Sequence, residues 1–133
     1  MDEVSNKNTF SKQEKLKGKK NYEILFTKGK RIKVYTVQLC YHSMGFKDGS
    51  PLKVAVVAPK KKFKKAIQRN RVKRLLRESY RLNKSLVFNN IEGNFALLFV
   101  YLGNTVPTFA QVESAMSQLL KKFIEQQSHE KNS

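Results

Sequence analysis

The chain has 133 residues, of which 40% are apolar, and 27 lysines and arginines against 10 acids give it a net charge of +17. This length supports one modest hydrophobic core and excludes two domains. A single cysteine, Cys40, excludes an internal disulfide, and two histidines are too few for the usual zinc sites.

Apolar runs are short throughout the sequence. None has the length of a membrane span, and the amino terminus lacks the apolar core of a secretion signal. We therefore expect a cytoplasmic protein with no membrane partner. The polar termini are expected to form disordered tails at residues 1–9 and 127–133, around one folded domain at residues 10–126.

The first predicted element is a short helix at Leu16–Thr27. It carries Tyr22, Leu25 and Phe26, and Gly29 is its predicted carboxyl-terminal cap.

Two extended segments follow this helix. Val34–Tyr41 alternates and is rich in β-branched and aromatic residues, and Leu52–Ala58 is a second apolar run. The residues between them contain glycine, aspartate, serine and proline, which are typical of a loop. We expect the two segments to pair as an antiparallel hairpin, with Cys40 as a small apolar strand residue.

Residues 60–84 form the most strongly charged part of the chain, with twelve lysines or arginines and a single acid, Glu78. We expect a helix that faces a polyanion, because the bases of Arg69–Arg77 are mostly arginines, whose planar guanidinium groups suit phosphate. A solvated basic face is the alternative interpretation and would be favoured for an ordinary charge run. The charge density of this segment favours nucleic acid instead.

Helical periodicity divides the basic segment into two faces. An apolar stripe is expected to pack on the rest of the protein and consists of Val72, Leu75, Leu76, Ser79, Tyr80 and Leu86. The opposite face carries a row of Asn70, Arg74, Arg77 and Arg81, flanked by Lys73 and Lys84. Like charges four residues apart repel by a few tenths of a kcal/mol per pair, a cost that an external anion would remove.

Two elements are predicted after the basic helix. Phe95–Leu102 is almost continuously apolar, which suits a buried central strand. Pro107, Thr108 and Gln111 indicate the start of a helix with a capping box, and an apolar stripe follows at helical spacing. The predicted order is therefore helix, strand, strand, helix, strand, helix.

The chain offers no recognisable catalytic set. A two-metal nuclease needs clustered carboxylates, whereas Asp2 and Asp48 are the only aspartates and the glutamates are scattered. His42 is alone on a predicted strand and His129 lies in a predicted tail, so paired histidines for acid–base catalysis are not expected. The sequence predicts a binding protein with no catalytic residue and no metal site of its own.

The run Arg69-Asn70-Arg71-Val72-Lys73-Arg74, continuing to Arg77 and Arg81, closely resembles the signature of the bacterial ribonuclease P protein subunit. In that family an RNR motif lies on a helix after an apolar strand and a lysine-rich turn, and VVAPKKKFKKAI precedes it here. The resemblance covers roughly residues 10–125 and includes Tyr22 and Phe26, four residues apart, before Gly29. The turn departs from many members, with Pro59 and Phe63 and paired lysines where those members have serine and glycine.

The resemblance implies a single α+β domain, with a small central sheet packed by helices. Such a fold is similar to a ribosomal protein domain and contains a left-handed βαβ crossover. It also implies a ribonucleoprotein whose RNA removes the 5′ leader of precursor tRNA with Mg²⁺ held mainly by RNA, so the protein alone would bind no cofactor. The implied partners are the ribonuclease P catalytic RNA and precursor tRNA, with no DNA.

Two RNA-binding surfaces are implied. The basic helix would face the catalytic RNA through Arg69, Asn70, Arg71, Lys73, Arg74, Arg77 and Arg81, with Lys61, Lys62, Lys64 and Lys65 of the turn as companions. A cleft between helix and sheet would hold the leader against Tyr22, Phe26 and either Tyr35 or Tyr41. Aromatic platforms beside basic side chains suit an extended single strand, and plain core packing is the alternative for Tyr22 and Phe26.

Two other functions stay open at this stage. A ribosomal-type structural protein or general RNA chaperone would bind tRNA whether or not it carries a leader. A self-sufficient nuclease is the weakest alternative, because the sequence lacks a catalytic set.

Overall fold

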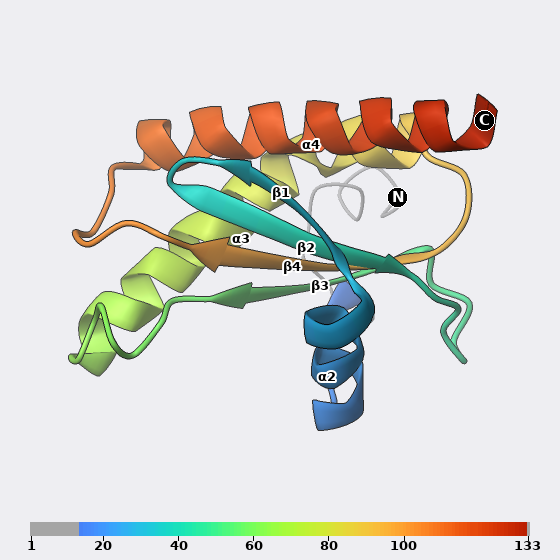
Figure 1. The fold of residues 1–133 in the computed structure, drawn as a ribbon. Helices are drawn as coiled ribbons and strands as arrows, with labels where there is room; N and C mark the ends of the chain where they lie inside the picture. The colour runs from blue at the N-terminus through green and yellow to red at the C-terminus, as the bar shows by residue number, and fades with distance from the viewer. Residues whose placement is uncertain (1–13, 133) are drawn as a thin grey trace, which may run out of the picture.

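The computed structural model describes residues 14–132, so the expected amino-terminal tail lies outside the described residues (Figure 1). The elements in chain order are α2 (Lys19–Lys28), β1 (Lys30–Val34), β2 (Val37–Ser43), β3 (Leu52–Val57), α3 (Ala66–Asn90), β4 (Phe95–Tyr101) and α4 (Phe109–Asn132).

The four strands form one mixed sheet in the order β1-β2-β4-β3. β2 is antiparallel to both β1 and β4, whereas β3 runs parallel to β4. The predicted hairpin between Val34–Tyr41 and Leu52–Ala58 is therefore wrong, because β4 lies between the two segments. The prediction of a buried central strand at Phe95–Leu102 is confirmed, since a strand that is apolar on both faces gains most from that position.

The segment predicted as one strand, Val34–Tyr41, contributes to two strands. β1 ends at Val34, residues 35–36 form a turn, and β2 begins at Val37. β1 could not be predicted from apolar alternation, because its sequence, KRIKV, is mostly charged and Ile32 is its one buried residue. The observed order therefore has one more strand than the predicted order.

β3, α3 and β4 form a βαβ unit with two adjacent parallel strands. In Figure 1 both strands point to the left, β4 lies above β3, and α3 passes behind the sheet. This path is a left-handed crossover, the rare sense of this connection.

The two faces of the sheet pack against different helices. α3 and α4 cover one face, and the large side chains of this core include Leu39, Tyr41, Leu76, Tyr80, Leu97, Phe99, Leu119 and Phe123. α2 packs on the opposite face, where a smaller cluster consists of Leu16, Leu25, Cys40, Ala55, Ala96 and Leu98. We call this second side of the sheet the α2 face.

α4 begins with the predicted capping box. The Thr108 backbone N–H donates to Oε1 of Gln111 at 3.0 Å, and the Gln111 N–H donates to Oγ1 of Thr108 at 3.2 Å. The helix then continues to Asn132, so residues 127–132 are helical and the expected tail is wrong for them. No glycine or proline interrupts residues 109–132. None of the helices within residues 14–132 combines the length and apolarity needed to cross a membrane.

α2 starts three residues later than predicted, and Gly29 is its carboxyl-terminal cap, as expected. The Gly29 N–H donates to the Leu25 carbonyl at 3.0 Å. A Cβ at this position would lie 2.3 Å from the same oxygen, so the chain needs glycine there for a close approach.

The segment before α2 is attached to the edge of the sheet. The Leu16 N–H donates to the Val54 carbonyl at 2.9 Å, and Lys15 forms a parallel bridge to the same residue. Because β3 is the outer strand on this side, the segment covers backbone groups that would otherwise be an open edge.

Candidate nucleic-acid interface

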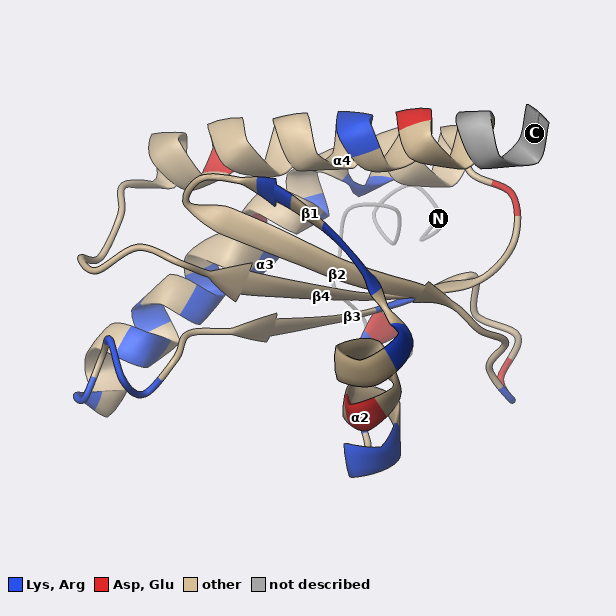
Figure 2. Ribbon diagram, viewed as in Figure 1, with Lys and Arg blue, Asp and Glu red and all other residues tan. Residues whose placement is uncertain are grey.

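The basic row lies on the solvent side of α3, as predicted. Figure 2 shows lysine and arginine concentrated on the turn before α3 and along the first part of the helix. Asn70, Arg71, Arg74 and Arg77 are exposed, and Lys73 is half-buried. The predicted apolar stripe is confirmed on the opposite side, where Val72, Leu76, Ser79 and Tyr80 are fully buried. The helix is thus fixed to the core through one face and offers guanidinium groups from the other.

A shallow hollow lies on this exposed face, lined by Ile67, Asn70, Arg71, Arg74 and Leu75. Ile67 is the most exposed large apolar side chain in the described chain, at 82%. The arginines therefore border an apolar spot, a combination that suits the charged backbone and the flat bases of RNA.

α3 begins at Ala66, so the predicted helix at residues 60–84 is wrong for its first six residues, which form a turn, and the observed helix extends six residues further. Phe63 anchors the turn, since it is buried and its ring centroid lies 5.9 Å from that of Tyr101. Nη1 of Arg69 donates to the carbonyls of Phe63 and Lys64, both at 2.9 Å. Arg69 therefore stabilises the turn.

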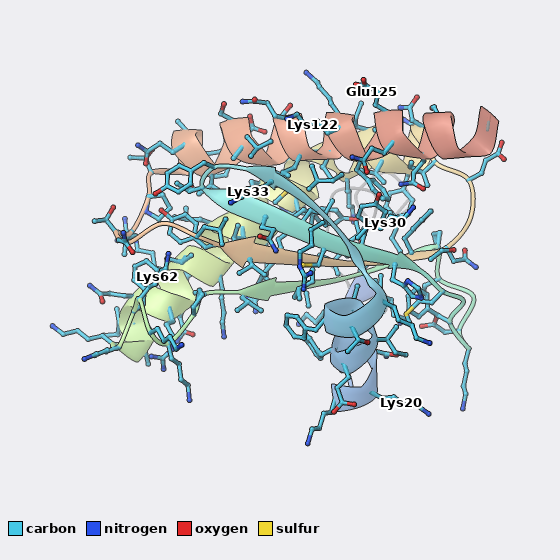
Figure 3. All side chains as sticks on the ribbon, viewed as in Figure 1. Lys20, Lys30, Lys33, Lys62, Lys122 and Glu125 are labelled. Carbon is cyan, nitrogen blue, oxygen red and sulfur yellow. The ribbon has the colours of Figure 1, made fainter. Side chains whose placement is uncertain are left out.

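The lysines of the turn are exposed. They are Lys60, Lys61, Lys62, Lys64 and Lys65. Nζ of Lys62 donates to the Leu102 carbonyl, which connects the turn to the loop after β4. Figure 3 places Lys62 at the end of the molecule where α3 begins. The structure thus joins the turn and the basic row into one continuous cationic surface.

The end of the basic row differs from the prediction. Arg81 is half-buried and pairs with Glu78, its Nε donating to Oε2 at 3.1 Å. This hydrogen bond lowers the pKa of the Glu78 carboxyl and raises the pKa of the Arg81 guanidinium. The accessible positive charge of α3 therefore ends near Arg77.

Lys84 does not flank the row, because it is buried. Its Nζ donates to Oε1 and Oε2 of Glu14 at 2.8 and 3.0 Å. Burial, followed by the charge of Glu14, raises the pKa of the neighbouring Tyr80 phenol. This charged group is part of the core and attaches the segment before α2 to α3.

The predicted aromatic pair lies on α2. Tyr22 is half-buried against the α2 face of the sheet, and its hydroxyl donates to the Leu16 carbonyl at 3.3 Å. Phe26 is 51% exposed. Core packing therefore accounts for much of Tyr22, whereas about half of the Phe26 surface stays accessible to a ligand.

The structure does not bring the two strand tyrosines to this pair. Tyr41 points to the other face of the sheet, where its ring packs edge-on against Phe123 at 4.8 Å and its hydroxyl donates to Gln126 at 2.7 Å. The alternative that places Tyr41 in the cleft is therefore wrong. Tyr35 is exposed in the turn between β1 and β2, at the opposite end of β1 from α2.

Strand register identifies residues that the sequence did not single out. On β2 the side chains that share the α2 face are Gln38, Cys40 and His42, because alternate residues point to the same face. Gln38 lies opposite Val100, which in turn lies opposite Val57, and all three are half-buried. This row retains partial exposure on the α2 face, as His42 does, so it can form the sheet side of a groove next to α2.

Within the described part of the chain, no three histidine, cysteine, aspartate or glutamate side chains gather as metal ligands. His42 is half-buried on β2 and Cys40 is buried.

Comparison with known proteins identifies one family. The family model described as ribonuclease P matches residues 10–124. The ribonuclease P protein component of Porphyromonas gingivalis strain ATCC 33277 is 34% identical over 113 residues, which cover 83% of this chain and 82% of that protein. The corresponding protein of Chlorobaculum tepidum is 27% identical over 129 residues, covering 88% and 84%.

Solved structures show the same fold. The RNase P protein of Staphylococcus aureus matches with a TM-score of 0.66 at 18% identity, over 83% of this chain and 94% of that one. The RNase P protein of Thermotoga maritima matches with a TM-score of 0.67 at 23% identity, over 82% and 96%. The predicted α+β class, with a small sheet packed by helices in one domain, is confirmed.

Proposed function

Because the chain belongs to the ribonuclease P protein family, we propose that it is the RNA-binding subunit of a ribonucleoprotein that removes the 5′ leader of precursor tRNA. The RNA of the particle performs the cleavage, and the protein contributes affinity for both RNAs. It acts in the cytoplasm, with catalytic RNA and precursor tRNA as its partners, and with neither DNA nor a membrane among them.

The exposed arginine row of α3 is the observation that carries this proposal. Arg71, Arg74 and Arg77 are exposed on a helix whose opposite face is buried in the core. Their guanidinium groups therefore extend from a rigid backbone. Guanidinium groups bind phosphate in a bidentate manner, and their repulsion along the helix falls when phosphates lie between them. We assign this row and the lysine turn to the catalytic RNA.

The leader is assigned to the α2 face. Phe26 and the accessible edge of Tyr22 provide stacking surface, and the row of Gln38, Val100 and Val57 provides the floor beside them. Stacking on aromatic rings accepts any base, which fits a leader whose sequence differs between tRNAs. Tyr35 is too far along β1 to join this group and is not assigned to it.

Mg²⁺ takes part in this proposal as an ion held mainly by RNA. The basic surface is a poor site for it, since Glu78, the one acid of the basic segment, is paired with Arg81. The protein therefore assists the ion indirectly, by lowering the repulsion between RNA phosphates.

The test is cleavage of a leader-bearing precursor tRNA at low Mg²⁺ by a bacterial ribonuclease P RNA, with and without the protein. Protein alone is the control for contaminating nuclease. Stimulation that needs both components supports the proposal. Its absence with a well-folded protein would favour a ribosomal-type structural protein or a general RNA chaperone.

A pair of variants tests the assigned surface. Arg74→Ala/Arg77→Ala should weaken assembly with the catalytic RNA and reduce the dependence of log Kd on log salt by roughly 1.4 to 1.8, about 0.7 to 0.9 for each lost phosphate contact. Lys121→Ala/Lys122→Ala removes the same charge from α4 and is the matched control. Figure 3 shows Lys122 far from Lys62 of the lysine turn. Equal assembly by both variants would contradict the assignment of α3.

A further inference from the structure

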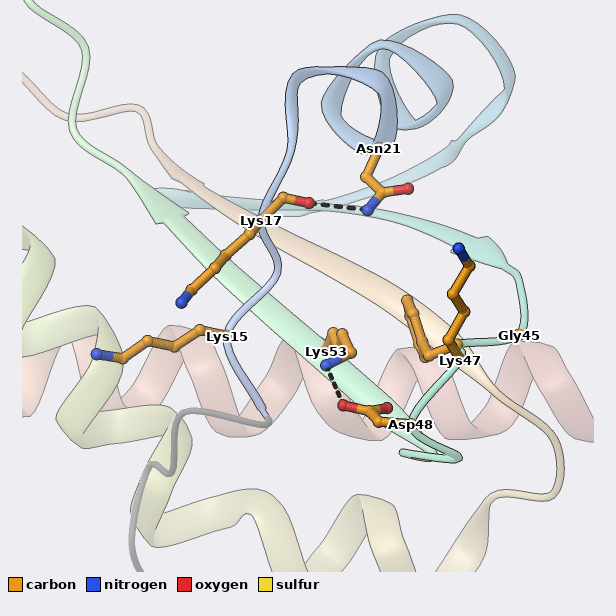
Figure 4. A pocket seen from close by; sticks show the side chains of 8 residues that line it. Lys15, Lys17, Asn21, Gly45, Lys47, Asp48 and Lys53 are labelled. Atoms are coloured by element: carbon orange, nitrogen blue, oxygen red, sulfur yellow. Dashed lines mark hydrogen bonds and ion pairs between the residues drawn. The ribbon is translucent and has the colours of Figure 1, made fainter.

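A second group of cations lies outside the surfaces assigned above. Figure 4 shows it as a pocket between the segment before α2, α2 itself, the loop after β2, and β3. Its cavity is about 570 Å³, and its lining residues are Lys15, Lys17, Asn21, Gly45, Phe46, Lys47, Asp48 and Lys53. We call it the lysine pocket.

The pocket has a strong excess of positive charge. It is lined by four lysines and a single acid, Asp48. That acid is already engaged, because its carboxylate accepts from Nζ of Lys53 at 2.8 Å and from the Ser50 N–H at 3.0 Å. These hydrogen bonds lower the pKa of the Asp48 carboxyl to about 2. Because Asp48 pairs with Lys53, the positive charges of Lys15, Lys17 and Lys47 are not neutralised by a carboxylate that lines the pocket, and they can attract an anion.

Packing holds the floor of the pocket in place. Lys53 extends from β3, its side chain is 16% exposed, and its Nζ lies 5.5 Å from the centre of the Phe46 ring. The rim is fixed as well, since Nδ2 of Asn21 donates to the Lys17 carbonyl at 2.8 Å (Figure 4). The backbone of Lys17 is thus held on one side of the pocket, and Lys47 extends from the loop on the other side (Figure 4).

The lysine pocket and the aromatic pair lie on opposite flanks of α2. Leu25 points into the sheet and is fully buried. At about 100° per residue, Asn21 falls about 40° to one side of Leu25, whereas Tyr22 and Phe26 fall about 60° and 100° to the other side. A strand of RNA stacked on Phe26 would need to cross only the width of one helix to place a phosphate in the pocket.

We propose that the lysine pocket binds a backbone phosphate of the precursor tRNA, as a contact separate from both the arginine row and the aromatic pair. This inference rests on the proposed function. The substrate is favoured over the catalytic RNA because the pocket opens beside α2, on the face of the sheet to which the leader is assigned, whereas α3 packs on the opposite face.

The test compares two variants in the complete ribonucleoprotein. Lys17→Ala/Lys47→Ala removes two exposed lysines of the pocket, and Lys121→Ala/Lys122→Ala removes two exposed lysines of α4. The Kd of leader-bearing precursor tRNA is measured for each assembled particle over a range of salt concentrations, and the Kd of protein for catalytic RNA is measured separately. Thermal melting of each protein confirms that it is folded, and glutamine replaces alanine if the first variant melts early.

The pocket variant should bind precursor tRNA about tenfold more weakly at physiological salt, with the salt dependence of log Kd reduced by about 0.7, the value for one single-strand phosphate contact. Its affinity for catalytic RNA should equal that of the control. Substrate binding equal to that of the control would overturn the inference. Weaker binding of the variant protein to catalytic RNA, with unchanged binding of precursor tRNA, would also overturn the inference, because the pocket would then contact the catalytic RNA.

Failure of the proposed function would look different. In that case the unmodified protein would not stimulate cleavage, and the arginine variant of α3 would assemble as well as its control.

Discussion

Replacing Lys84 with methionine tests whether a buried ion pair attaches the segment before α2 to α3. Lys84 is 2% exposed, and its ammonium donates to both carboxylate oxygens of Glu14. Methionine keeps most of the length of the lysine stem, so the substitution removes charge and donors with little change in volume.

The expected loss in the free energy of unfolding comes from the Glu14 carboxylate, which remains after Lys84 is replaced. The Glu14 side chain is only 13% exposed, and after the substitution its carboxylate lacks the ammonium that faced it. Removing one partner of a buried pair costs about 3–5 kcal/mol. A domain of this size has about 5–15 kcal/mol of stability, so a large part would be lost. The corresponding fall in Tm is about 10–20 °C.

Urea unfolding of four proteins gives the measurement: the unmodified chain, Lys84→Met, Glu14→Gln and the double variant. The double variant should recover most of the lost free energy of unfolding, because it has removed both charges and leaves no unpaired charge in the core. Lys121→Met, on the exposed side of α4, is the control and should stay within about 0.5 kcal/mol of the unmodified chain. A Lys84→Met protein as stable as this control would refute the reasoning.

Three further outcomes are expected. Gly29→Ala should lower the free energy of unfolding by about 2 kcal/mol or more, since the added Cβ would lie 2.3 Å from a backbone carbonyl oxygen; denaturant unfolding measures this, and an unchanged midpoint would contradict the close approach. Thr108→Ala should cost about 1 kcal/mol through loss of the capping box with Gln111, and a Gln111→Ala protein should lose a similar amount by the same assay. The Asp48 carboxyl should titrate near pH 2 by NMR. Its contribution to stability should be complete above its ordinary pKa of 3.8 and should be lost as the pH falls toward 2. In Lys53→Met the pKa of Asp48 should rise toward 3.8, and an unchanged pKa would mean that the ion pair does not lower it.

The basic face of α3 could be predicted because its information is local. A helical period of 3.6 residues separates Val72 and Leu76 from Arg74 and Arg77 with no knowledge of the rest of the fold. The same argument fails for Lys84, which shares the angle of the basic row. Its partner, Glu14, is 70 residues away in sequence, and only the folded chain brings the two together.

The strand tyrosines show a second limit. Alternation places Tyr41 and Cys40 on opposite faces of β2, but it does not say which face meets which helix. That choice depends on α4, whose Phe123 packs on Tyr41. The lysine pocket was hidden for a related reason, because its lining comes from the segment before α2, α2, the loop after β2, and β3, which only the folded chain brings together.

The central place of β4 has a consequence for synthesis of the protein. β2 and β3 leave the ribosome before β4, but they do not pair with each other. Each pairs with β4, which lies between them, so the sheet cannot be completed until β4 is made. About 44 residues separate the end of β3 from the end of β4, which takes about 2–9 s at about 5–20 residues per second. α3 (Ala66–Asn90) is synthesised within that interval, before β4, so it is made while the sheet on which it packs is still incomplete. The newborn chain therefore presents its most cationic segment before its core can close, and polyanions in the cell can meet that segment before the protein is finished.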